Sequence, residues 1–245
     1  MSQDRTIAIA SGKGGVGKTW FAITLAHALS RLGRRVLLFD ADLGLANVDI
    51  QLGLTPRLDL ASVISGRASI ADVTMRHADG GFAIVAGRSG SGMLSALDPA
   101  ALERLLDTLR VEAAHYDVVL LDLGAGLELP VRRMSAWAGR LVVLATEEPT
   151  SLTDAYAVLK LHAADRPEGD ARVVVNQATT RAAGERTFAT LERACQTFLG
   201  RAPVLAGVVR RDERVRHAIR RQALLLMRFP NSPAAADVET IARLL

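Results

Sequence analysis

Residues 11–19 constrain the fold of this chain more than any other stretch. They read SGKGGVGKT and match the spacing G-x-x-x-x-G-K-T, counted from Gly12. An apolar run at residues 7–10 precedes them, and apolar residues at helical spacing follow. Strand, glycine-rich turn and helix in this order are typical of a phosphate-binding loop. A chance glycine-rich turn would not explain why all three elements agree.

Each residue type in this loop has a chemical reason. Glycine lets the backbone turn with positive φ and come close to a ligand. Successive N–H groups and the helix N-terminus present partial positive charge to phosphates. We expect Lys18 to reach the β- and γ-phosphates and the Thr19 hydroxyl to ligate Mg²⁺. The residues predicted to bind nucleotide in this stretch are Gly12, Lys13, Gly14, Gly15, Val16, Gly17, Lys18, Thr19 and Trp20.

A second lysine, Lys13, lies inside the same loop. The chain has three lysines, at positions 13, 18 and 160, so arginine supplies 27 of its 30 basic residues. Two of the three lysines therefore share one turn, where a compact ammonium group suits phosphate better than a planar guanidinium group. We predict catalytic roles for both Lys13 and Lys18. An exposed loop cation is the simpler explanation for Lys13.

Carboxylates follow two further apolar runs. Residues 36–39 end in Asp40-Ala41-Asp42, and residues 118–121 end at Asp122. Parallel strands read as continuous apolar runs, and ligands collect beyond their carboxyl ends. We predict that Asp40 lies near the water shell of the metal, that Asp42 orients an attacking water, and that Asp122 holds Mg²⁺ through water. A polar segment at residues 44–49 is placed to sense the γ-phosphate.

The remaining pattern predicts an α/β fold. Apolar runs at residues 82–86, 141–145, 173–175 and 205–209 predict further strands. Residues 98–110 and 183–199 predict helices, and a further helix, ending at residue 164, is predicted after the stretch 146–154. Residues 58–70 show only weak helical spacing, and residues 87–92 are predicted to be flexible. We expect a doubly wound, mostly parallel sheet flanked by helices, as one domain over residues 1–245. Asn176 follows a strand, where its amide could read adenine or cap a turn.

Composition excludes several classes. The chain has no apolar run near the roughly 18 residues that a transmembrane helix needs. Six residues precede the first predicted strand, so we expect no signal peptide and a cytoplasmic protein. A single cysteine, Cys195, excludes a disulfide framework and an iron–sulfur cluster, and we expect it to be buried.

Positive charge is concentrated late in the chain. The net charge is +4, and seven arginines lie between residues 210 and 228, opposed locally by Asp212 and Glu213. Such a cluster can meet DNA, anionic lipid or an acidic partner, and it can equally be a solvated helix face. The sequence leaves these alternatives open.

The loop KGGVGKT resembles the deviant Walker A motif of the MinD/ParA ATPases, which are P-loop NTPases of the SIMIBI type. The segments DADLGLANVD from Asp40, DLGAGL from Asp122 and EPTSLTDAY from Glu148, with the ending RRQ…FPNSPAA, look like the flagellar FlhG/FleN branch of that family. In that branch ATP drives dimerisation, the dimer engages membrane or partner proteins, and hydrolysis resets it.

The resemblance implies roles for individual residues. Lys13 would reach the phosphates of the partner subunit and act in hydrolysis with Asp42. Asp40, Asp122 and Thr19 would serve the metal. The residues implied beside the nucleotide outside the loop are Asn176, facing adenine, Asp154, on the dimer side of the cleft, and Arg210, which stands where the family normally has proline.

The function expected from the resemblance is a slow ATPase that works as a dimerisation switch and positions or counts cellular structures. ATP and Mg²⁺ are the expected cofactors. The expected partners are a second copy of the chain and a flagellar or polar regulator, with the inner membrane surface as a further contact. Two alternatives stand beside it. One is a DNA-partitioning ATPase that binds DNA through its arginines, and the other is an adaptor with little hydrolysis, for which Trp20 and Arg210 would be signs of a changed site.

Overall fold

The computed structural model describes residues 5–42, 44, 46–87 and 98–245. Within this part of the chain, eight strands form one sheet in the order β3-β4-β2-β5-β1-β6-β7-β8, and every neighbouring pair is parallel except β3 and β4. The strands are β1 Thr6–Ser11, β2 Val36–Ala41, β3 Thr74–Arg76, β4 Ala83–Val85, β5 Val118–Ala125, β6 Arg140–Ala145, β7 Asp170–Ala178 and β8 Val204–Arg210. The predicted α/β class with a mostly parallel sheet is confirmed.

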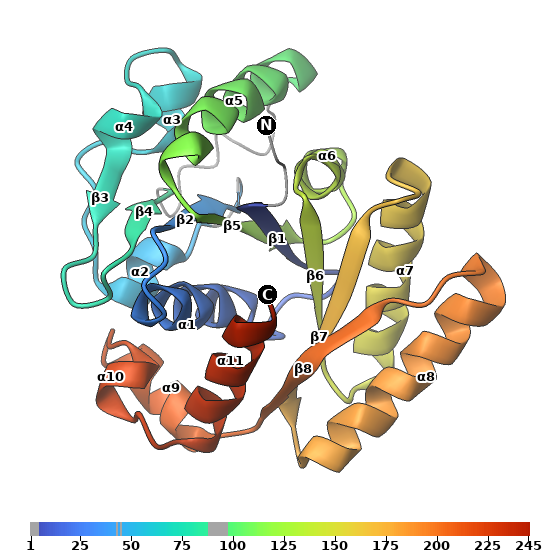
Figure 1. The fold of residues 1–245 in the computed structure, drawn as a ribbon. Coiled ribbons are helices and arrows are strands. Elements are labelled where there is room, and N and C mark those ends of the chain that lie inside the picture. Colours follow the sequence, from blue (N-terminus) through green and yellow to red (C-terminus); the bar gives the residue numbers. More distant parts are fainter. Residues whose placement is uncertain (1–4, 43, 45, 88–97) are drawn as a thin grey trace.

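Helices cover both faces of this sheet (Figure 1). One face carries α1 Lys18–Arg31, α2 Val48–Leu52, α9 Glu213–Arg220, α10 Leu225–Arg228 and α11 Pro233–Leu244. The other carries α3 Leu60–Ile64, α4 Ile70–Val73, α5 Pro99–Glu112, α6 Leu129–Trp137, α7 Pro149–Asp165 and α8 Arg181–Leu199. A short 3-10 turn, Ala113–His115, follows α5. Each helix layer closes a separate hydrophobic core against the sheet.

Strand β1 lies near the middle of the sheet, and all six of its residues are buried. Because side chains alternate across a strand, Ile7 and Ile9 enter the core beneath α1, whereas Ala8 and Ala10 enter the core on the opposite face. A strand buried on both faces tolerates few polar residues. This explains the uninterrupted apolar run in front of the loop, and it fixes the start of the loop between two packed cores.

Local sequence features explain where helices α1 and α5 begin. Gly17 precedes α1 with a φ of 90°, a left-handed conformation that glycine adopts without strain. In α5, the Asp98 side chain accepts a hydrogen bond from the Ala101 amide and Pro99 occupies the first turn, as the sequence predicts. Residues 88–92 of the segment predicted to be flexible lie outside the described residues.

The structure differs from the sequence patterns in three places. The weakly helical residues 58–70 contribute α3 and lead into α4. The antiparallel edge strand β3 and the helix α6 have no clear sequence signal, because β3 has three residues and α6 buries only Met134 and Ser135. Strand β5 continues beyond residue 121 to Ala125, so Asp122 lies inside the strand. Packing against neighbouring strands keeps it extended.

Candidate functional site

The glycine-rich loop connects β1 to α1 at the carboxyl edge of the sheet. Gly15 and Gly17 have φ values of 80° and 90°, which an L side chain rarely adopts. A Cβ on Gly12 would lie 2.5 Å from the main-chain oxygen of Asp154, so this glycine is required for close packing of the loop against α7. The loop therefore has the backbone of an anion cradle, and the predicted residue Asp154 lies at its side.

Lys18 lies on the floor of this cradle. Its Nζ is 3.4 Å from Oδ1 of Asp122, and the side chains are 8% and 1% exposed. Burial raises the pKa of the Asp122 carboxyl, while the charge of Lys18 and hydrogen bonds from Thr19 and Lys18 lower it. The structure thus brings together three residues that the sequence predicted for phosphate and metal binding. Lys18 and Thr19 come from α1 and Asp122 from β5.

Asp40 lies beside Asp122, because the two occupy paired positions on the adjacent strands β2 and β5. Its Oδ2 accepts hydrogen bonds from the amides of Asn47 and Val48 at 3.2 and 3.1 Å, and its Oδ1 accepts one from the amide of Asp42. Burial and the charge of Asp122 raise the pKa of Asp40 to about 7. Two carboxylates this deeply buried favour the binding of a cation between them and the loop.

Asp42 stands one position beyond β2, half-buried. Its Oδ1 accepts a hydrogen bond from the amide of Gly44 at 3.3 Å. A Cβ on Gly124 of β5 would also lie 3.3 Å from this oxygen, so the carboxylate reaches over the strand that carries Asp122. This places Asp42 beside the cradle, where a carboxylate can orient water. Residue 45 of the predicted sensing segment lies outside the described residues.

The donor set on the floor fits Mg²⁺. A threonine hydroxyl and buried carboxylates are the oxygen ligands that this ion prefers. Oδ2 of Asp122 is buried without a hydrogen-bond partner, which is unusual for a buried polar atom. Among the described residues, no cluster of three histidine, cysteine or acidic side chains could hold a metal by itself. Phosphate oxygens and water would therefore complete the coordination.

Lys13 occupies the rim of the cradle. Its Nζ donates hydrogen bonds to Oε2 of Glu148 at 2.6 Å and to Oγ1 of Thr150 at 3.1 Å. The Lys13 and Glu148 side chains are 38% and 66% exposed. The hydrogen bond and charge of Lys13 lower the pKa of Glu148. The amine predicted to act across a dimer is therefore held by its own chain, at the start of α7.

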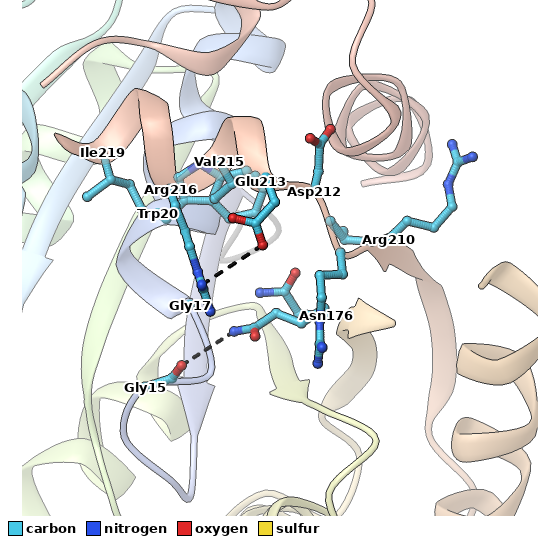
Figure 2. Close-up of a pocket in the computed structure, with 13 residues that line it drawn as sticks. Gly15, Gly17, Trp20, Asn176, Arg210, Asp212, Glu213, Val215, Arg216 and Ile219 are labelled. Atoms are coloured by element: carbon cyan, nitrogen blue, oxygen red, sulfur yellow. Dashed lines mark hydrogen bonds and ion pairs between the residues drawn. The ribbon is translucent and has the colours of Figure 1, made fainter. Parts of the chain in front are cut away.

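A cavity of about 270 Å³ opens beside the loop (Figure 2). It is close to the lower end of the range for small-ligand pockets, roughly 300 Å³. Trp20, Val215 and Ile219 give it an apolar side, which suits a flat base. The full lining is Gly15, Gly17, Trp20, Asn176, Gln177, Val209, Arg210, Arg211, Asp212, Glu213, Val215, Arg216 and Ile219. The predicted residues Trp20, Asn176 and Arg210 all line this cavity.

Arg210 lines the cavity, but its guanidinium group is engaged elsewhere. Nε and Nη2 make a bidentate contact with the Asp237 carboxylate of α11 at 2.8 and 2.9 Å, and Nη2 also contacts the main-chain oxygen of Pro233. The Asp237 side chain is 1% exposed and also pairs with Arg181. A buried carboxylate requires such partners. Arg210 thus ties the wall of the cavity to α11.

Asn176 faces both the cavity and the loop. Its Nδ2 donates to the main-chain oxygen of Val16 at 2.7 Å, and the side chain is buried. Gln177, which no sequence pattern predicts as a site residue, donates to the main-chain oxygen of Gly15 at 3.4 Å. Glu148 and Thr150 are likewise not predicted from the sequence as site residues. Their contact with Lys13 spans more than 130 residues of sequence, and no local pattern signals it.

The arginine cluster is exposed on and around α9. Arg214, Arg216 and Arg220 are exposed, and Arg216 lies 3.9 Å from Glu213. The inner face of the same helix contributes Val215 and Ile219 to the cavity. Arg216 also lines the cavity, whereas Arg214 and Arg220 do not line it and are exposed to solvent.

The structure bears on two predictions made from composition, one about Cys195 and one about membrane-spanning helices. Cys195 is buried, as predicted, and burial raises its pKa to about 11. Across the described residues, no helix combines the length and apolar character needed to cross a membrane.

Comparison with known proteins agrees with this geometry. The family model for the CobQ/CobB/MinD/ParA nucleotide binding domain matches residues 7–225. Antiactivator FleN of Pseudomonas aeruginosa is 40% identical over 239 residues, which cover 98% of this chain and 85% of that protein. The flagellum site-determining protein YlxH of Helicobacter pylori is 27% identical over 98% of this chain and 81% of its own length.

Solved structures share the fold. The septum site-determining protein MinD of Pyrococcus horikoshii, solved in complex with Mg-ADP, superposes with a TM-score of 0.81 at 24% identity, over 98% of this chain and 95% of that one. The cell division ATPase MinD of Pyrococcus furiosus gives a TM-score of 0.82, also at 24% identity, over 98% and 97%. At this identity the likeness concerns the fold.

Proposed function

This chain belongs to the CobQ/CobB/MinD/ParA nucleotide-binding family, and we propose that it is a slow ATPase that works as an ATP-dependent dimerisation switch. The observation that carries the proposal is the pair of lysines in one loop. Lys18 is buried against Asp122, and Lys13 is held at the rim by an exposed carboxylate. One lysine is fixed for binding phosphate, and the other is free to exchange partners.

The floor of the loop would bind the triphosphate. Main-chain N–H groups and the N-terminus of α1 supply partial positive charge, and Lys18 adds a full charge close to the phosphates. Thr19, Asp40 and Asp122 would hold Mg²⁺, which when bound neutralises charge on the phosphate oxygens. The cavity lined by Trp20 and Asn176 would take the base. Phosphoryl transfer depends mainly on such positioning and charge neutralisation.

Asp42 would orient the attacking water. Its carboxylate lies beside the buried acidic floor, and the Gly44 amide holds one of its oxygens. A carboxylate in this position can accept a hydrogen bond from water and aim the oxygen lone pair at phosphorus. Gly124 leaves room for this approach, since a Cβ there would lie only 3.3 Å from the Asp42 carboxylate.

Dimerisation would complete the site. In the single chain, Glu148 and Thr150 bind the Lys13 amine, so it does not contribute charge at its own phosphates. We propose that contact with a second copy releases Lys13 and delivers it to the partner's nucleotide, as an arginine finger does. Asp154, packed against Gly12, would then lie at the dimer side of the loop. Monomers should therefore hydrolyse ATP poorly.

The biological role is proposed from the relatives. One is named an antiactivator and another a flagellum site-determining protein. We propose that this chain likewise helps set the number or place of flagella or a similar polar structure. It would act in the cytoplasm through a flagellar or polar regulator, with peripheral contact at the inner membrane surface.

A DNA-partitioning ATPase is the second candidate function, because α9 presents exposed arginines to solvent. Sedimentation with anionic liposomes and with duplex DNA, each with and without ATP, separates the two. ATP-dependent binding to DNA that weakens steeply with salt would favour the second candidate. If the protein sediments with liposomes in an ATP-dependent manner, or with neither liposomes nor DNA, the first candidate function is favoured. ATP binding without measurable turnover at any protein concentration would instead indicate an adaptor.

A further inference from the structure

Two consecutive amides at the end of β7 contact two consecutive carbonyls of the phosphate loop. Nδ2 of Asn176 donates to the main-chain oxygen of Val16 at 2.7 Å, and Nε2 of Gln177 donates to that of Gly15 at 3.4 Å. Figure 2 shows the second of these contacts as a dashed line. The contacts join segments about 160 residues apart in sequence. They link the strand end directly to the loop.

The backbone of β7 is distorted at this point. Neighbouring residues of a strand normally point to opposite faces, so two successive side chains should not reach one loop. Gln177, however, has a φ of 57°, which is uncommon for a residue other than glycine. The register between β7 and β8 also shifts between Val175 and Ala178. The distortion brings both amides to the loop, and strained backbone of this kind clusters at functional sites.

These contacts determine where the loop N–H groups point. A trans peptide is planar, so its C=O and N–H point in opposite directions. Holding the Gly15 oxygen toward β7 turns the Val16 N–H away from β7, and holding the Val16 oxygen does the same for the Gly17 N–H. The amide side chains thus orient N–H groups on the opposite side of the loop backbone, where the cradle requires donors.

The close approach explains why residue 17 is glycine. A Cβ at this position would lie 2.6 Å from Nδ2 of Asn176. The left-handed φ of 90° adds a second reason. The phosphate loop and the end of β7 therefore fit each other in shape, and hydrogen bonds also join them.

We propose that Asn176 and Gln177 form an amide clamp, a pair of positioning residues that pre-orients the phosphate-binding N–H groups whatever base is bound. The inference deepens the proposed function and rests on it. It differs from the base-reading role that the sequence suggested for Asn176. A base reader discriminates between nucleotides, whereas the clamp supports every ligand that carries a polyphosphate.

The test measures the affinities of ATP, GTP and inorganic tripolyphosphate, each with Mg²⁺, by calorimetry on wild type, Asn176→Ala and Gln177→Gly. Glycine at position 177 removes the amide but keeps the left-handed backbone available. We expect each variant to lose roughly three- to tenfold in affinity for all three ligands alike. Hydrogen–deuterium exchange of residues 12–19 without ligand should rise, while exchange in β6 stays unchanged.

Gln222 offers a matched control. It is also a glutamine with a left-handed backbone, at a φ of 49°, and its Nε2 donates to the main-chain oxygen of Ile50, away from the loop. Gln222→Gly should leave all three affinities unchanged. Loss confined to ATP, or unchanged affinities in both clamp variants, would overturn the inference while leaving the proposed function intact. A wild type that binds none of the three ligands would overturn both.

Discussion

The two lysines of the phosphate loop lie in opposite surroundings. On the floor, Lys18 Nζ is 3.4 Å from Asp122, and the two side chains are 8% and 1% exposed. At the rim, Lys13 Nζ is only 2.6 Å from Glu148, but these side chains are 38% and 66% exposed. Judged by distance alone, the rim pair would be the stronger one.

Burial reverses that order. An ion pair in solvent contributes about 0–1 kcal/mol, because water screens it and two flexible side chains must be ordered. Removing one partner of a buried pair costs about 3–5 kcal/mol, because the other charge is left without compensation. The floor is therefore a fixed part of the fold, whereas the rim contact can be exchanged for another at little cost. A switch requires both properties in one loop.

The largest expected effect comes from the floor. Lys18→Ala should lower the free energy of unfolding by about 3–5 kcal/mol and abolish ATP binding, since Asp122 loses its only nearby charge partner among the described residues. Denaturant unfolding and calorimetry measure both. The double variant Lys18→Met with Asp122→Leu should recover stability without recovering ATP binding. A Lys18→Ala protein as stable as wild type would contradict the contrast between floor and rim.

Asp42→Ala should lower turnover by roughly 10²-fold or more while ATP binding is retained, because the water loses its orienting carboxylate. The dimer should then persist in ATP, which size-exclusion chromatography would show. Asp59→Ala is a suitable control, since Asp59 caps α3 outside the site. Normal turnover in Asp42→Ala would mean that another group orients the water.

The buried Asp40 carboxyl on the floor should change its protonation state near neutral pH, whereas the Glu148 carboxylate at the rim should not. The pKa of Asp40 is about 7 in the folded protein and 3.8 in its ordinary state. Between these values the folded protein holds a proton that the unfolded chain lacks. This contribution to stability is complete below pH 3.8 and is lost as the pH rises through 7.

Asp40→Asn should therefore flatten the fall in stability of the nucleotide-free protein between pH 3.8 and about pH 7. Unfolding in denaturant at a series of pH values, compared with wild type, measures the difference. Glu148→Gln should leave this profile unchanged, because the pKa of Glu148 is lowered and its carboxylate is already ionised there. Parallel profiles for wild type and Asp40→Asn would show that Asp40 is not the titrating group.

The smallest effect is expected at the rim. Glu148→Gln weakens the hold on Lys13, so turnover at limiting protein concentration should rise, by roughly fivefold at most. Stability should change by less than about 0.5 kcal/mol. Glu147→Gln is the matched control, because Glu147 binds Thr179 instead of Lys13. Equal turnover in both variants and wild type would show that releasing Lys13 costs nothing measurable.

The sequence predicts the floor better than the rim for a physical reason. Lys18 and Thr19 begin α1, and Asp40 and Asp122 lie toward the carboxyl ends of β2 and β5, so local pattern and the geometry of parallel strands bring all four to one edge. The Lys13 contact with Glu148 depends on where two exposed side chains meet across two loops. Because both side chains are exposed, packing constrains them little, and no periodic sequence pattern identifies them as a pair.

The residues that line the cavity beside the loop show a similar limit to prediction from the sequence. The sequence places Asn176 and Arg210 beside the cavity, and both line it. It does not reveal that the Arg210 guanidinium is bound by Asp237 in α11, or that Asn176 donates to the loop. These hydrogen bonds follow from the tertiary packing of buried polar groups, each of which must find a partner. Strand β3 and helix α6 are missed because packing, and not a strong local pattern, stabilises them.

The central claim is that two copies of the chain complete one hydrolytic site through Lys13. Its most direct test is ATP turnover per subunit, measured over a wide range of protein concentration for wild type and Lys13→Ala. We expect the wild-type rate to rise with concentration to a plateau, and the variant to stay flat and roughly 10³-fold lower while binding ATP normally. A rate independent of concentration, equal in the two proteins, would contradict the account.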